Sequence, residues 1–161
     1  MDVNKLVKNI FGLNADEKFF KMYFKSFKVG KLRRAVLLLK LKRLQEKKNS
    51  YIGRSVDTFQ EKPFFPHGLH CIHIAAGCRI GKNVTIFQNV TIGQSKEKYP
   101  MIGDNVIIGA GANIIGDVKI GNNVRIGAGA VVTFDVPDNS TVVGQKARIL
   151  KRDPDYWVEE Y

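Results

Sequence analysis

A six-residue repeat dominates the second half of the chain. From Ile74 the sequence divides into "IAAGCR", "IGKNVT", "IFQNVT" and "IGQSKE", and after a break into "IGDNVI", "IGAGAN", "IIGDVK", "IGNNVR", "IGAGAV" and "VTFDVP". Every block begins with Ile or Val, and most have a small or β-branched residue at the fifth position. Apolar contacts on an α-helix recur every three or four residues, so this period does not fit a helix. It predicts a solenoid of short parallel strands whose aliphatic residues stack from coil to coil.

The repeat also predicts corners and one loop. Gly is frequent at the second position, where it permits positive φ or a close approach of neighbouring chains. Ile92 and Ile102 are ten positions apart instead of six, so residues 94–100 ("QSKEKYP") should leave the solenoid as a loop. Loops on a rigid scaffold often carry binding residues.

The first 48 residues have a different composition. They contain 14 Lys and Arg against 4 Asp and Glu, a balance of +10, whereas residues 49–161 carry 12 against 11, a balance of +1. Apolar residues and lysines alternate there at helical spacing, which predicts two or three helices. The main interpretation is a helical cap with a solvated basic face, and the alternative is contact with an anionic membrane surface. No nucleic-acid-binding motif accompanies the charge, so we expect no nucleic-acid partner.

The length of 161 residues predicts one domain. The charge distribution, the histidines and the repeats divide it into four segments. They are a basic helical segment (1–50), a lead-in with the histidines (51–73), the repeats (74–136) and a closing segment (137–161). The sequence has no long apolar stretch and no signal-peptide pattern, which predicts a cytoplasmic protein, with a peripheral position at the inner face of the membrane as the variant. Two cysteines are too few for a disulfide framework.

Residues 63–150 resemble a known family. "PHGLHCIHIAAGCRIGKNVTIFQNVTIG" followed by "MIGDNVIIGAGANIIGDVKIGNNVRIGAGAVV" is similar to the hexapeptide-repeat acyltransferases, in the branch of serine acetyltransferases and polysaccharide O-acetyltransferases. The resemblance implies a mainly β fold, a left-handed parallel β-helix with an α-helical N-terminal segment. It also implies a homotrimer that transfers acetyl from acetyl-CoA to a hydroxyl without a metal.

All three histidines lie in residues 67–73. The resemblance places the catalytic residue at His67 in "PHG", where a neutral imidazole can take the proton of the attacking alcohol. Pro66 stands where the family usually has an Asp that orients this histidine, so another carboxylate such as Asp57 would have to serve. His70 is a substrate contact, a second base or a structural residue, and His73 should point away from the core.

These histidines also allow two other chemistries. Carbonic-anhydrase-like proteins share the fold and bind zinc through three histidines, but their ligands come from separate coils and subunits, so we expect no metal here. Cys71 allows a covalent acyl-cysteine route with a histidine as base. We prefer the interpretation that Cys71 is a small buried thiol.

For acetyl-CoA the resemblance implies a cleft between adjacent β-helices of the trimer, bounded by small-residue coils. By the same resemblance, Ala110 and Ala128 occupy the contact positions. Arg125 falls where the family often has a basic residue near the CoA phosphates, and Arg148 falls in the segment that closes over CoA. A solvated surface side chain is the alternative for both arginines. Lys146 replaces the proline that usually precedes this Ala-Arg pair.

The acceptor is where the sequence departs from serine acetyltransferases. Tyr99 stands in the loop where those enzymes have a second histidine, and no Arg or His is beside it. A tyrosine ring can stack on a sugar and bond its hydroxyls. The main prediction is therefore a saccharide acceptor in surface-polysaccharide biosynthesis, with serine as the alternative acceptor. An inactive scaffold that docks to a membrane or protein is the alternative of another class.

Overall fold

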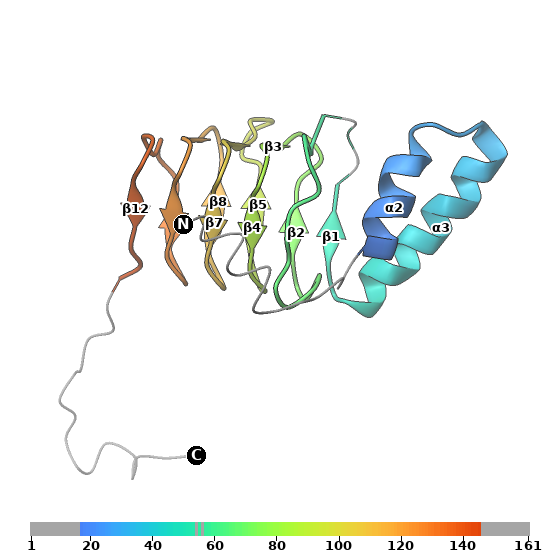
Figure 1. Ribbon diagram of the computed structural model, residues 1–161, viewed down its shortest axis with the longest axis horizontal. Helices are drawn as coiled ribbons and strands as arrows, with labels where there is room; N and C mark the ends of the chain where they lie inside the picture. The colour runs from blue at the N-terminus through green and yellow to red at the C-terminus, as the bar shows by residue number, and fades with distance from the viewer. Residues whose placement is uncertain (1–16, 54, 56, 146–161) are drawn as a thin grey trace, which may run out of the picture.

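The computed structural model describes residues 17–53, 55 and 57–145, which form a prism of short strands with two helices at one end (Figure 1). The helices are α2 (Glu17–Ser26) and α3 (Lys31–Lys47). The strands are β1 (Tyr51–Ile52), β2 (His73–Ile74), β3 (Arg79–Ile80), β4 (Thr85–Ile86), β5 (Thr91–Gly93), β6 (Met101–Ile102), β7 (Ile107–Ile108), β8 (Asn113–Ile115), β9 (Lys119–Ile120), β10 (Arg125–Ile126), β11 (Val131–Val132) and β12 (Thr141–Val142).

The strands form three parallel sheets, one on each face of the prism. The first face has the order β1-β2-β5-β8-β11, the second β3-β6-β9 and the third β4-β7-β10-β12. Each coil visits the faces in this order, so we call the turns between them the first corner (first to second face), the second corner (second to third) and the third corner (third face to the next coil). The predicted mainly β fold, a parallel β-helix with an α-helical N-terminal segment, is confirmed.

The repeat positions predicted to point inward form the core. The residues at the first and fifth positions are at most 4% exposed, and burial of each aliphatic side chain stabilises the fold by about 1.5–3 kcal/mol. The first positions are Ile74, Ile80, Ile86, Ile92, Ile102, Ile108, Ile114, Ile120, Ile126 and Val132, and the fifth are Cys78, Val84, Val90, Val106, Ala112, Val118, Val124 and Ala130.

The glycines at the second position serve close packing and not positive φ. A Cβ added at Gly103 would lie 2.7 Å from the carbonyl oxygen of Gly121 one coil away. At the second corner, positive φ is instead adopted by asparagine, which tolerates the left-handed region better than most residues. These asparagines have φ between 53° and 59°: Asn83, Asn105, Asn123 and Asn139.

Helix α2 closes the end of the prism beside β1 (Figure 1). The ring of Phe20 stacks on Phe65 with centroids 5.6 Å apart and meets Phe59 edge-on at 5.4 Å. The hydroxyl of Tyr23 donates to the carbonyl of Gly53 at 3.2 Å. A solenoid needs such a cap because its terminal coil would otherwise expose the core. Neither described helix is long and apolar enough to cross a membrane.

The coiled region is longer than the visible repeat. Phe59 pairs with Ile80 and Phe64 with Thr85, so these residues and β1 build a coil before the first hexad. At the other end, Val136 pairs with Ile120 on the second face, ahead of β12 on the third. The added first coil uses bulky aromatic side chains at irregular spacing, which hides it from a six-residue period.

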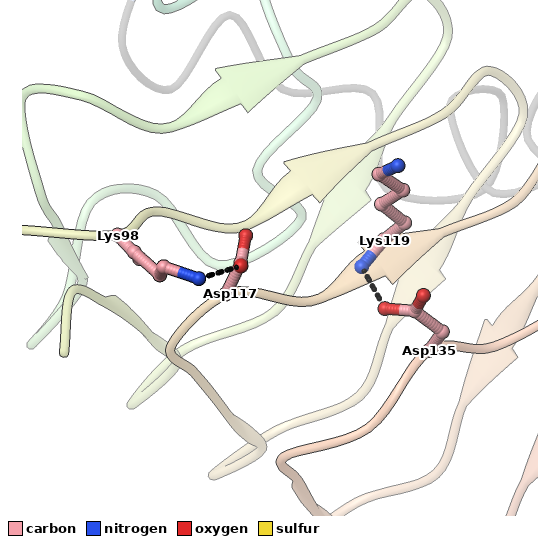
Figure 2. A network of polar contacts seen from close by, with 4 residues as sticks. All are labelled: Lys98, Asp117, Lys119 and Asp135. Carbon is pink, nitrogen blue, oxygen red and sulfur yellow. Dashed lines mark hydrogen bonds and ion pairs between the residues drawn. The ribbon is translucent and has the colours of Figure 1, made fainter.

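Residues 94–100 form a loop at the first corner. Ser95 and Lys98 exchange two backbone hydrogen bonds of 3.0 Å, and Lys96 and Glu97 between them have positive φ, as in a tight hairpin turn. The Lys98 ammonium donates to Asp117 at 2.6 Å, which ties the loop to the next coil (Figure 2). This exposed ion pair raises the pKa of Lys98 and lowers that of Asp117, mainly through the hydrogen bond. Figure 2 also shows the Asp135 carboxylate accepting from the backbone N–H of Lys119.

Candidate active site

His67 lies in a tight turn at the start of the third corner. The backbone N–H of Gly68 donates to the carbonyl of Phe65 at 3.1 Å, with Pro66 second in the turn. Proline presets the backbone at that place, and Gly68 takes φ 71°, which suits glycine. Phe65 is buried whereas His67 is exposed, and the His67 ring lies 5.8 Å from that of Phe87 one coil on. The turn therefore fixes the backbone at His67 and leaves the imidazole exposed to solvent.

The end of α3 holds the rest of this loop. The hydroxyl of Ser50 donates to the carbonyl of Leu69 at 2.6 Å and accepts from the N–H of Ile72 at 3.0 Å. The N–H of Cys71 donates to the carbonyl of Lys48 at 3.0 Å. Because Ser50 is buried, these bonds are protected from water and fix the loop against the helical cap.

The small-residue coils continue the same corner beyond His67. The N–H of Asn89 donates to the carbonyl of His70, that of Gly111 to Gln88 and that of Gly129 to Ala110. Ala110 is half-buried and Ala128 is exposed, so little side chain covers the backbone here. Arg125 is exposed on β10, just before this corner.

The structure therefore brings His67, Ala110 and Ala128 to one corner. Arg148, the fourth residue assigned to acetyl-CoA, lies outside the described residues.

Tyr99 and Asp57 lie at the first corner, away from His67. Tyr99 is half-buried, and its ring covers Gly77, where an added Cβ would lie 2.5 Å from the ring. Asp57 is exposed between β1 and the second face. The suggestion that Asp57 orients His67 does not fit one chain, because the two residues occupy different corners. Within one chain Tyr99 and His67 therefore do not belong to the same site.

His70 has a partner that the sequence did not reveal. The Lys48 ammonium lies 3.1 Å from Nε2 of His70. Lys48 precedes His70 by 22 residues at the end of α3, so only the fold brings them together. His73 is exposed on β2. Within the part of the chain that the structure describes, no three His, Cys, Asp or Glu side chains cluster closely enough to hold a metal ion.

The two cysteines have opposite environments. Cys71 is exposed with φ 51°, so the expectation of a small buried thiol was wrong. The reason is the turn around Cys71, which turns its side chain outward between the buried Leu69 and Ile72. Cys78 is buried, and burial raises the pKa of its thiol to about 11. A protonated thiol is a poor nucleophile, so Cys78 is a core residue.

The six-residue repeat and the parallel β-helix that it builds are features that this chain shares with a known class, the hexapeptide-repeat proteins. The family model "Bacterial transferase hexapeptide (six repeats)" matches residues 99–133. Serine acetyltransferase of Staphylococcus aureus strain Mu50 is 48% identical over 94 residues, which are 56% of this chain and 44% of that protein. The chain thus spans less than half the length of the curated relatives it matches.

Solved structures agree with this match. Serine acetyltransferase from Neisseria gonorrhoeae in complex with serine superposes with a TM-score of 0.55 at 32% identity, covering 73% of this chain and 48% of that one. A serine acetyltransferase in complex with CoA superposes with a TM-score of 0.65 at 26% identity. The match covers 87% of this chain and 57% of that one. The resemblance to hexapeptide-repeat acyltransferases of the serine acetyltransferase type is confirmed.

Proposed function

We propose that this protein is an O-acetyltransferase that moves acetyl from acetyl-CoA to a hydroxyl. The observation that carries the proposal is the exposed His67 at the head of the same corner as Ala110 and Ala128. The similarity to serine acetyltransferases, one of them solved with CoA, supports it.

In the proposed reaction His67 is the general base. The acceptor oxygen attacks the thioester carbonyl carbon as His67 takes the hydroxyl proton, which gives a tetrahedral oxyanion. The oxyanion then collapses, the carbon–sulfur bond breaks, and the thiolate of CoA receives the proton from His67. The new ester and free CoA balance the reaction, so no metal and no acyl-enzyme are needed.

Acetyl-CoA would lie along the third corner, over Ala110 and Ala128 and beside Arg125. We propose a homotrimer in which a second β-helix provides the other wall of the cleft. Such an arrangement would also let the loop with Tyr99 reach the His67 of a neighbour, which one chain alone does not permit. Sedimentation tests the trimer, and an active monomer would exclude this cleft.

For the acceptor we propose serine first, because the similar proteins are serine acetyltransferases and one was solved with serine. A saccharide is the second candidate, supported by the half-buried ring of Tyr99 in the loop. This order reverses the prediction from sequence. That prediction rested on Tyr99 in place of the second histidine, with no Arg or His beside it, and on Pro66 in place of the usual Asp.

The deciding experiment is release of free CoA with serine, hexoses, N-acetylhexosamines and their nucleotide- or lipid-linked forms. We expect the highest kcat/KM on serine, and a sugar that exceeds serine would restore the saccharide assignment. Tyr99→Ala should reduce use of the acceptor more than binding of acetyl-CoA, with Tyr51→Ala on the first face as the matched control. Intact acetyl-CoA with every acceptor would support the scaffold alternative.

We also propose that the outer side of α3 contacts an anionic membrane. The helix carries 7 Lys and Arg against 1 Glu, and Leu32 and Leu39 are 82% and 63% exposed. Apolar side chains among clustered cations suit the surface of an acidic leaflet. Cosedimentation with phosphatidylserine vesicles should exceed that with phosphatidylcholine and fall for Leu39→Glu. Equal recovery with both lipids would remove the membrane contact and leave a solvated helix.

A further inference from the structure

We infer that Lys48 and His70 form a binding subsite for an anionic group, a carboxylate or phosphate, on the hydroxyl acceptor. This inference rests on the proposed acetyl transfer and adds the feature by which the acceptor is selected.

The pair is a cationic site without a protein anion. The Lys48 ammonium lies 3.1 Å from Nε2 of His70. Because ammonium only donates hydrogen bonds, the imidazole must accept at Nε2 and carry its proton at Nδ1. Among the described residues the ion pairs are Lys42 with Glu46 and Lys98 with Asp117, so no carboxylate there neutralises Lys48.

The backbone of Lys48 is fixed against the loop that carries His67, so its ammonium starts from a defined place. Lys48 is half-buried at the end of α3, and its carbonyl accepts from the N–H of Cys71. His70 is exposed three residues after His67, in the same loop. The N–H of His70 donates to the carbonyl of Gly68, the residue after His67, which keeps this stretch compact. A bound acceptor can therefore place its hydroxyl near His67 while its charged group meets Lys48.

The chemistry of this subsite selects acceptors by charge. A carboxylate or phosphate would accept from the Lys48 ammonium in a charge-assisted hydrogen bond, which is stronger than a bond between neutral groups. The carboxylate of serine would then have a cation beside the loop that carries His67. A sugar phosphate would have the same partner, but a neutral sugar would leave the cation unpaired.

The test compares charged and neutral acceptors in the wild type and in Lys48→Met. Acceptor pairs are serine with serinamide, and a hexosamine 1-phosphate with the free hexosamine. We expect Lys48→Met to lower kcat/KM for the charged member of the used pair roughly 10- to 100-fold. The neutral member and the KM for acetyl-CoA should change less than about twofold. Whether serine or the sugar phosphate shows the loss identifies the source of the anion.

Controls separate charge recognition from folding. Lys47→Met removes a neighbouring exposed lysine and should leave both acceptors unchanged, and Lys48→Arg should keep most of the selectivity. Equal losses on charged and neutral acceptors would assign Lys48 a structural role and overturn the subsite, as would equal losses in Lys47→Met. If the wild type released no CoA with any acceptor, the proposed function itself would fail, and the subsite with it.

Discussion

The second and third corners of the prism come from the same repeat but are covered differently. At the second corner, asparagine side chains stack in a ladder, with Nδ2 donating to Oδ1 at 2.9 Å from Asn83 to Asn105, 3.1 Å from Asn105 to Asn123 and 3.0 Å from Asn123 to Asn139. Carboxylate and amide oxygens of Asp104, Asn122 and Asp138 also accept from backbone N–H groups of the preceding coil. Polar side chains thus satisfy the exposed backbone at nearly every step.

The third corner has no such ladder among the described residues. In the coils after the His67 loop its positive-φ positions are Asn89, Gly111 and Gly129, and the residues before the two glycines are Ala110 and Ala128. Among the described residues, the coils after the His67 loop are connected at this corner by backbone hydrogen bonds, from Asn89 to His70, from Gly111 to Gln88 and from Gly129 to Ala110. The contrast teaches that the repeat fixes the prism, while the choice of corner residue decides whether an edge is covered for stability or left open for a ligand. Substitutions at the third corner should affect activity, and those at the second corner should affect stability.

The largest effect is expected at the head of the third corner. His67→Ala should lose activity roughly 10²-fold or more, the scale for a general base. Its thermal unfolding should stay close to that of the wild type because the imidazole is exposed. CoA release measures the first property and circular dichroism the second, with His73→Ala as control. Near-normal turnover in folded His67→Ala would move the base to His70 or Cys71.

The next effect concerns the open part of the third corner. Ala128→Trp puts a large ring where we place acetyl-CoA and should raise its KM about tenfold or more, equivalent to about 1.4 kcal/mol. Stability should change little because Ala128 is exposed. Lys82→Trp, at the exposed second corner, is the matched control. An unchanged KM in Ala128→Trp would show that this corner does not hold the donor.

A smaller effect is expected in the asparagine ladder. Asn105→Ala removes two side-chain hydrogen bonds and forces alanine to φ 57°, which should lower the free energy of unfolding by about 1–2 kcal/mol. Urea unfolding measures this loss. Asn105→Gly removes the ladder without the backbone strain and should recover part of the stability. A loss of activity in folded Asn105→Ala would contradict the division between the corners.

The smallest effect is expected from the exposed cysteine. Cys71→Ser should keep activity within about twofold, because direct transfer needs no thiol. In the native wild type, the exposed Cys71 should react quickly with a thiol reagent at pH 8. Cys78 should react only on unfolding, since it is buried and its pKa is raised to about 11. A loss as large as that of His67→Ala would instead favour the acyl-cysteine route.

The sequence predicts the fold well where one physical rule applies at every step. Any residue at the first or fifth position meets its counterpart one coil away, so Ile74 or Val124 can be placed in the core by counting. The first coil cannot be predicted in this way, because Phe59 and Phe64 do not follow the six-residue period. The use of Gly103 for close packing and of Asn105 for positive φ also depends on distances between coils, which the sequence does not state.

The candidate site was only partly predictable. His67 could be found through its motif, and Ala110 and Ala128 through the spacing of the repeat. Lys48 could not be found, because its approach to His70 depends on where α3 ends against the loop. The separation of Tyr99 and Asp57 from His67 likewise follows from which corner each occupies, a property of the closed prism.

The stacking of equal coils makes the third corner a ruler. Strands in neighbouring coils lie about 4.8 Å apart, so the three steps from the His67 turn to the turn at Ala128 span roughly 14 Å. The contacts of an extended ligand along this edge therefore lie at whole multiples of the coil spacing from His67. One coil inserted between the His67 turn and the Ala128 turn would lengthen this distance by one strand spacing, about 4.8 Å, without altering His67 or the helical cap. The number of coils can thus set the length of the ligand that the corner accommodates, while the chemistry at His67 stays the same.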